Sequence, residues 1–270
     1  MSQEDLHQRY VAAIALAEEA GALASCYFQD RAQMGTKMKG FQDFVTAADG
    51  AVEALLRRRI AEAFPSDGFL GEEGGGSHSA DLWVVDPIDG TANFARGEPH
   101  WAVSIGFLRN NVPEIGVLAV PTLKELFAAR RGHGATCNGA PIRVSTVDDM
   151  RTAAVEIGWS PRRPTKSYIA LVAKVMDMGA TVKRSASGAL GMAWTACGRV
   201  DAYLELHINC WDVAAGMVLA SEAGAKVNDF FRDGWLADGN PVLVSTPALA
   251  GPLADAMALD RALLLPPDAD

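Results

Sequence analysis

Two carboxylates lie three residues apart in the stretch Asp86–Pro87–Ile88–Asp89–Gly90–Thr91, directly after the apolar run Leu82–Val85. This run is short, rich in β-forming residues and bounded by turn-forming residues, so it predicts a buried strand. Two ionised carboxylates at the end of a buried strand destabilise the fold unless a cation accompanies them. Hard oxygen ligands on a turn stiffened by proline are typical of a magnesium site.

The next residues favour an anion beside that cation. Gly90 lets the backbone approach a ligand closely, and Thr91 is expected to begin a helix whose first N–H groups suit a phosphate. The six residues together therefore indicate a magnesium–phosphate site. The alternative is a local turn in which Asp86 or Asp89 only caps a helix.

Other acidic residues bear on the choice between these two interpretations. Glu72 and Glu73 lie in the glycine-rich stretch Gly71–Ser79, which we expect to be a loop. Asp212 stands at the predicted start of one helix, and Asp49 precedes another. Either aspartate could simply interact with the dipole of its helix, so neither identifies a site when taken alone.

Taken together, these motifs resemble the inositol monophosphatase family. The resemblance rests on Gly71–Glu73, on Asp86–Phe94 with its sequence DPIDGTANF, and on Trp211–Asp212. It extends from Val45–Asp49 through Glu222–Gly224 in the order of the family's motifs. The resemblance implies a magnesium-dependent, lithium-sensitive phosphatase that acts on phosphorylated sugars and related polyols.

The resemblance also implies a set of metal ligands. One Mg²⁺ would bind Glu72, Asp86 and the backbone carbonyl of Ile88. A second would bind Asp86, Asp89 and Asp212, and a third ion would lie with its waters near Glu72. All of these ligands are oxygen atoms, as a hard cation requires.

By the same resemblance, Glu72, Thr91 and Asp49 are the candidate catalytic residues. The Thr91 hydroxyl and the Asp49 carboxylate would orient and deprotonate the attacking water, without a phosphoenzyme. The residues expected to contact the substrate are Asp89, Gly90, Thr91, Ala186, Ser187, Gly188, Glu205 and Asp212.

Several substrates are compatible with these residues. Thr91–Phe94 and Glu205 favour the inositol branch, so inositol 1-phosphate is the expected substrate. Ala186–Ser187–Gly188 departs from the family's Gly-Ser/Thr-Ala segment, which leaves the leaving alcohol open. Histidinol phosphate and fructose 1,6-bisphosphate are the alternatives within the superfamily. An alternative of another class is a protein that binds the transcription machinery, as some bacterial relatives do.

The elements that would position these residues change character along the chain. Apolar residues at helical spacing predict helices over residues 6–28 and 49–64, and β patterns predict a hairpin over 103–120. After about residue 147 strands and helices alternate, and the last predicted helix covers residues 247–264.

We therefore expect an α+β half over residues 1–148, with an antiparallel sheet and most of the metal ligands. An α/β half over residues 149–270 would carry Asp212 and the substrate contacts. The resemblance implies that these halves form α-β-α-β-α layers, with the site between them.

Composition excludes some classes of protein. The 270 residues are 49% hydrophobic and 21% charged, which argues against a disordered chain. The net charge of −9 argues against direct binding of nucleic acid. The N-terminus lacks the apolar region of a secretory signal, and we expect no run of about 18 apolar residues that could span a membrane. The four scattered cysteines are expected to be free thiols in the cytoplasm, and the resemblance implies a homodimer.

Overall fold

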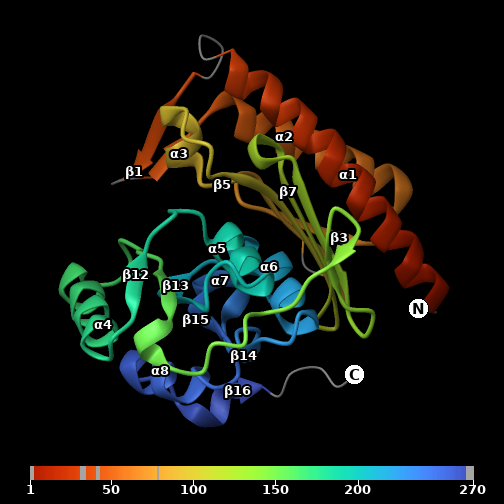
Figure 1. Cartoon of the computed structure of the whole chain (residues 1–270). Helices are drawn as coiled ribbons and strands as arrows, with labels where there is room; N and C mark the ends of the chain where they lie inside the picture. The colour runs from red at the N-terminus through yellow and green to blue at the C-terminus, as the bar shows by residue number, and fades with distance from the viewer. Residues whose placement is uncertain (1–2, 31–34, 41–42, 78, 266–270) are drawn as a thin grey trace.

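The computed structural model describes residues 3–30, 35–40, 43–77 and 79–265. Helices and sheets alternate in five layers, α-β-α-β-α, as Figure 1 shows. The predicted fold class is therefore confirmed.

The first two layers are a pair of helices and a large sheet. Helices α1 (Gln3–Gln29) and α2 (Ala47–Ala63) cover one face of a sheet with the strand order β10-β9-β8-β7-β6-β5-β3-β4. Neighbouring strands are antiparallel except β3 and β5, which are parallel. The strands are β3 (Gly68–Gly71), β4 (Gly75–Ser77), β5 (Asp81–Asp89), β6 (Ala102–Arg109), β7 (Val112–Val120), β8 (Glu125–Arg130), β9 (Ala135–Cys137) and β10 (Ala140–Pro141).

Helix α1 corrects the expectation that no segment is apolar enough to span a membrane. Its best window of 18 residues has a mean hydropathy of 1.4, so the helix is long and apolar enough to do so by length and composition alone. Its buried residues, among them Leu6, Ala13 and Ala20, belong to the core that α1 shares with α2 and the large sheet. The core helix of a folded domain satisfies the same criterion, so this feature is weak evidence for a membrane span.

The middle layer consists of α5 (Gly188–Ala196) and α6 (Cys210–Glu222), which are buried between the two sheets. Nine of the 13 residues of α6 are buried and all nine are apolar, as expected for a helix packed between two sheets. Gly106 and Gly116 let α6 approach the large sheet. A Cβ atom on Gly106 would lie 2.5 Å from the Cβ of Ala214. This close packing sets the position of Asp212 in the first turn of α6.

The fourth layer is a mixed sheet with the order β12-β11-β13-β15-β14-β16. Strands β12, β11 and β13 are parallel, and the other pairs are antiparallel. Helices α4 (Thr165–Asp177) and α8 (Ala250–Met257) pack on its outer face and form the fifth layer. The strands are β11 (Ala154–Ile157), β12 (Thr181–Lys183), β13 (Ala202–Ile208), β14 (Lys226–Asn228), β15 (Asn240–Ser245) and β16 (Leu264–Leu265).

Two predicted elements were wrong. The final helix was predicted over residues 247–264, but α8 ends at Met257, since Ala258 has a left-handed backbone (φ 56°) that breaks the helix. The stretch Gly71–Ser79, expected to be a loop, contains strand β4.

Short elements were not predicted from the sequence. Among them are the strands β1 (Lys37–Gly40) and β2 (Asp43–Val45) and the helix α7 (Trp235–Asp238). The first large sheet ends at Pro141 and the second sheet begins at Ala154. The division at residues 148 and 149 falls in the connection between them and stays a prediction.

Candidate active site

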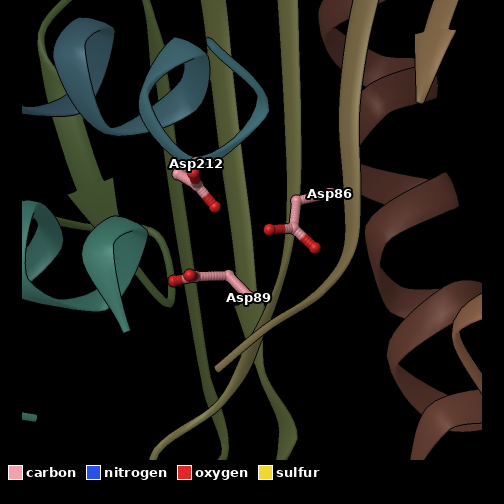
Figure 2. A group of neighbouring side chains, drawn as sticks. All are labelled: Asp86, Asp89 and Asp212. Carbon is pink, nitrogen blue, oxygen red and sulfur yellow. The ribbon is translucent and has the colours of Figure 1, made fainter. Parts of the chain in front are cut away.

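Three aspartates from separate parts of the chain meet where the middle helices approach the large sheet. Asp86 and Asp89 belong to β5, and Asp212 belongs to the first turn of α6. One carboxylate oxygen from each lies within 4.8 Å of the others. Figure 2 shows the three side chains gathered around a common space. The predicted motifs at residues 86–89 and at residue 212 are thus brought together by the fold.

Local hydrogen bonds orient two of these side chains. The pairing of β5 with β6 is irregular between Asp86 and Asp89, which lets both carboxylates face the same side. The Ile88 N–H donates to Asp86 Oδ1 at 2.9 Å. The Asn209 N–H donates to Asp212 Oδ2 at 3.2 Å as part of a capping box at the start of α6.

Asp89 also connects the large sheet, to which it belongs, with helix α5 of the middle layer. Its carboxylate accepts hydrogen bonds from the Ser187 hydroxyl, from the Gly188 N–H at 3.2 Å and from the Ala189 N–H at 2.9 Å. Asp89 therefore caps the N-terminus of α5. The capping role considered for Asp89 thus exists, but the helix that Asp89 caps is distant in the sequence. The cap coexists with the acidic cluster.

The electrostatics of the cluster indicate a cation. Burial raises the pKa of Asp86 well above its ordinary value, and the negative charges of Glu72, Asp212 and Asp89 raise it further. Burial and the charges of Asp89 and Glu72 likewise raise the pKa of Asp212. Burial raises the pKa of Asp89 to about 6 against the opposing effect of its hydrogen bonds.

These carboxyl groups fit a divalent metal ion. Asp86 and Asp89 are buried and Asp212 is partly buried, they repel one another, and all supply hard oxygen ligands. Glu72 lies at the end of β3, and its N–H donates to the Val85 carbonyl at 3.3 Å. A cavity of about 460 Å³ is lined by Glu72 together with Asp86, Ile88, Asp89 and Asp212.

Thr91 and Asp49 lie beside this cluster, at the starts of α3 (Thr91–Arg96) and α2. The Thr91 hydroxyl is 3.2 Å from Asp49 Oδ1 and 2.9 Å from the Ile88 carbonyl oxygen. Asp49 Oδ2 accepts from the Thr46 N–H at 2.8 Å and from the Thr46 hydroxyl at 2.6 Å. Burial raises the pKa of Asp49, so this carboxylate has an increased affinity for a proton.

Gly90 occupies a position that a larger residue could not adopt easily. Its φ is +90°, and a Cβ atom there would lie 2.8 Å from the His100 carbonyl oxygen. The turn between β5 and α3 therefore depends on glycine, and it places the Gly90 and Thr91 backbone against the cavity that holds Glu72 and Asp86.

A second, smaller cavity of about 190 Å³ adjoins the first. The two cavities are neighbours, because both are lined by Asp89, Arg184, Ala186 and Asp212. The predicted substrate residues Ser187, Gly188 and Glu205 line the smaller one.

Tyr203 was not predicted, although it lies in this smaller cavity. Its hydroxyl donates to Glu205 Oε2 at 2.6 Å. Burial raises the pKa of Glu205 to about 7, and this hydrogen bond acts in the opposite direction. The two residues are two apart on β13, so their positions on the same strand face could have indicated the pair. Arg162, Arg184 and Glu156 also line the cavity, and no sequence motif distinguished them.

The histidines near the motifs contact other groups. Nε2 of His207 lies 2.7 Å from the Asp238 carbonyl oxygen, and burial lowers the pKa of this histidine. The His100 ring packs edge-on against Trp194. Ala186, one of the predicted substrate residues, has a left-handed backbone with φ 62°.

The layered fold and the buried acidic cluster between its layers define a class of protein, the metal-dependent phosphatases. Within that class, the model of the inositol monophosphatase family matches residues 5–259. The chain therefore belongs to the inositol monophosphatase family and is a phosphatase.

Individual relatives agree with this assignment. The chain is 42% identical to Nus factor SuhB of Xylella fastidiosa over 71% of each chain, and 35% identical to Nus factor SuhB of Escherichia coli over 88% of this chain and 94% of the relative. Among solved structures, inositol monophosphatase from Anabaena is 33% identical and superposes with a TM-score of 0.81, covering 94% of this chain and 96% of the other. Extragenic suppressor protein suhB from Bartonella henselae is 29% identical with a TM-score of 0.83, over 90% of this chain and 96% of the other.

Proposed function

We propose that this phosphatase hydrolyses inositol 1-phosphate to inositol and phosphate and uses two to three Mg²⁺ ions. The observation that carries the proposal is the set of three aspartates whose carboxylate oxygens lie within 4.8 Å of one another. Their buried negative charges call for a divalent cation, and a phosphate ester brings an anion that such a cation attracts.

The residues that would hold the ions are those expected from the family motifs. Glu72, Asp86 and the Ile88 carbonyl would bind one ion, and Asp86, Asp89 and Asp212 would bind another, with a third near Glu72. Bound Mg²⁺ would lower the pKa of a water and neutralise charge on the phosphate oxygens.

Thr91 and Asp49 would move the proton of the attacking water. The Thr91 hydroxyl accepts that proton while it donates its own to Asp49, whose Oδ1 lies 3.2 Å away. The raised pKa of Asp49 suits it to receive a proton. The new P–O bond forms as the bond to the leaving alcohol breaks, and the leaving oxygen takes a proton from solvent.

The remaining predicted residues would bind the substrate. The amides of Gly90 and Thr91 would hold the phosphate beside Asp89 and Asp212. Ala186, Ser187, Gly188 and Glu205 would surround the leaving alcohol. Support comes from the residues that line both cavities, because a phosphate in the larger cavity would have its alcohol beside the smaller one.

The test is phosphate release, in millimolar Mg²⁺, from inositol 1-phosphate, histidinol phosphate, fructose 1,6-bisphosphate and 3′-phosphoadenosine 5′-phosphate. We expect a preference for inositol 1-phosphate that a chelator abolishes and that lithium inhibits. Preference for histidinol phosphate or fructose 1,6-bisphosphate would keep the metal site and overturn the proposed roles of Ser187 and Glu205. No turnover of any substrate would contradict the proposed reaction.

A second candidate function is association with the transcription machinery. It is favoured by the name Nus factor, which the relatives from Xylella fastidiosa and Escherichia coli carry. The test is co-purification with RNA polymerase of an Asp89→Asn variant that lacks hydrolysis. Co-purification of RNA polymerase with the variant would support this function. Failure of RNA polymerase to co-purify with either the variant or the unsubstituted protein would contradict it.

We further propose that the protein is a cytoplasmic homodimer without direct contact to nucleic acid or membrane. The net charge of −9 supports the lack of nucleic-acid binding. Sedimentation of the purified protein tests the dimer, and a monomeric mass at micromolar concentration would contradict it.

A further inference from the structure

The loop that carries Glu72 is held by a charged pair on helix α2, outside the acidic cluster. Glu53 is buried, with 4% of its surface exposed. Neither Glu53 nor its partner Arg57 belongs to the motifs described above. Its Oε2 accepts from the Glu73 N–H at 2.7 Å, and its Oε1 accepts from the Gly74 N–H at 2.9 Å. One carboxylate thus binds the two backbone amides that directly follow Glu72.

Arg57 completes this contact from the next turn of the same helix. Its Nη2 donates to Glu53 Oε1 at 2.9 Å and to the Gly75 carbonyl at 2.8 Å. The guanidinium group also lies over the ring of Phe69, at 4.3 Å from its centroid. The pair therefore binds the N–H groups of Glu73 and Gly74 and the carbonyl of Gly75.

Two glycines near Glu72 leave the space that this pair occupies. A Cβ atom on Gly74 would lie 2.6 Å from Glu53 Oε1 and 2.9 Å from Arg57 Nη2. A Cβ atom on Gly71 would overlap the Glu53 carboxylate. A side chain at position 71 or 74 would therefore displace Glu53, which explains why glycine stands at these two positions.

The backbone of Glu72 is held from both sides. On one side its own N–H donates to the Val85 carbonyl of β5, one residue before Asp86. On the other side the next two N–H groups are bound by Glu53. These contacts restrain the backbone from which the Glu72 side chain extends toward the cavity that Asp86 also lines.

We propose that Glu53, supported by Arg57, is a positioning residue that holds Glu72 in place as a ligand for the divalent cation. This inference rests on the proposed metal site and adds to it a residue that does not itself touch the cation. The residues that orient metal ligands commonly change cation affinity by about 10–100-fold when they are replaced.

The experiment compares Glu53→Gln with Glu222→Gln. Glu222 is a matched control, because its carboxylate likewise accepts the N–H groups of a glycine-containing turn, those of Gly132, His133 and Gly134. Mg²⁺ binding is measured by titration calorimetry. Amide hydrogen exchange over residues 72–76 is measured in the cation-free protein.

We expect Glu53→Gln to weaken Mg²⁺ binding by about tenfold and to accelerate exchange at residues 73 and 74. Glu222→Gln should leave both quantities unchanged. Unchanged cation affinity in Glu53→Gln would overturn the inference, whatever the exchange rates. Failure of the unsubstituted protein to bind Mg²⁺ would instead overturn the proposed metal site itself.

A second pair of variants tests the same contact without altering the charge. Gly74→Ala should separate the loop from the pair and weaken Mg²⁺ binding in the same direction as Glu53→Gln. Gly50→Ala is its control, since a Cβ atom on Gly50 meets no atom within 4 Å. Equal cation affinity in both alanine variants, with both folded by circular dichroism, would contradict the proposed positioning.

Discussion

Replacing Asp89 by asparagine should stabilise the cation-free protein at neutral pH although it removes hydrolysis. Burial raises the pKa of Asp89 from 3.8 to about 6. The folded state therefore holds this proton more tightly than the unfolded chain does. The resulting destabilisation is absent well below pH 3.8, grows as the pH rises towards about 6, and stays constant above that pH.

The expected magnitude follows from two opposing effects. The difference between the pKa values of 3.8 and about 6 corresponds to about 3 kcal/mol of destabilisation. The neutral asparagine would remove this destabilisation above about pH 6. The asparagine would weaken the cap on α5, since an amide nitrogen in place of Oδ2 cannot accept the hydrogen bonds that Ser187 and Ala189 donate to that atom. That loss is about 1 kcal/mol. The variant should thus be more stable by about 2 kcal/mol at about pH 7.5 and less stable by about 0.5 kcal/mol at about pH 4, where a small part of the destabilisation by Asp89 is already present.

The assay is urea unfolding in the presence of a chelator at both pH values. Comparing the variant with the unsubstituted protein cancels the titration of other carboxylates. Asp255→Asn is the control, because Asp255 is an exposed partner of Arg261 and its removal should change stability little at either pH. A variant that is less stable by the same amount at both pH values would refute the reasoning.

Adding Mg²⁺ should reverse the order of stability at neutral pH. The unsubstituted protein should gain about 2.7 kcal/mol when Mg²⁺ is at about 100 times its Kd. The variant, which lacks one ligand charge, should gain less. An equal gain in both proteins would show that Asp89 does not bind the cation.

Three further predictions concern single side chains of the site. Ala186→Gly should raise the free energy of unfolding by about 1 kcal/mol by relieving a left-handed backbone, and a lower urea midpoint would contradict this. Thr91→Val should lower kcat by about 10²–10⁴-fold with little change in KM, whereas Thr91→Ser should retain activity; equal kcat in both variants would exclude the proton path through Asp49. Tyr203→Phe removes a hydrogen bond that lowers the pKa of Glu205, so that pKa should rise above about 7 and the acidic limb of the pH–KM profile should move to higher pH; an unmoved limb would remove Glu205 from substrate binding.

Elements with a strong local pattern were predicted closely from the sequence. The helices predicted over residues 6–28 and 49–64 are present as α1 and α2. The hairpin turning at Asn110 and Asn111 is present, and both residues have the positive φ that such turns require. Elements of two to four residues, such as β4, carry too few residues for a periodicity to be recognised.

The acidic motif itself was recognisable because it is local. Asp86 and Asp89 follow a buried strand within one short segment, and Pro87 and Gly90 restrict the backbone between and after them. The sequence by itself therefore determined the class of chemistry: buried carboxylates beside a turn that suits a cation and a phosphate.

Only the tertiary structure decided how distant residues complete this site. Asp212 reaches the cluster because small residues let α6 pack closely on the large sheet, Asp89 caps a helix that begins about a hundred residues later, and Glu53 binds the loop of Glu72 from another helix. These contacts join segments far apart in the chain, and their geometry depends on how helices and sheets pack. Local residue patterns contain no information on that packing, whereas the folded layers determine it.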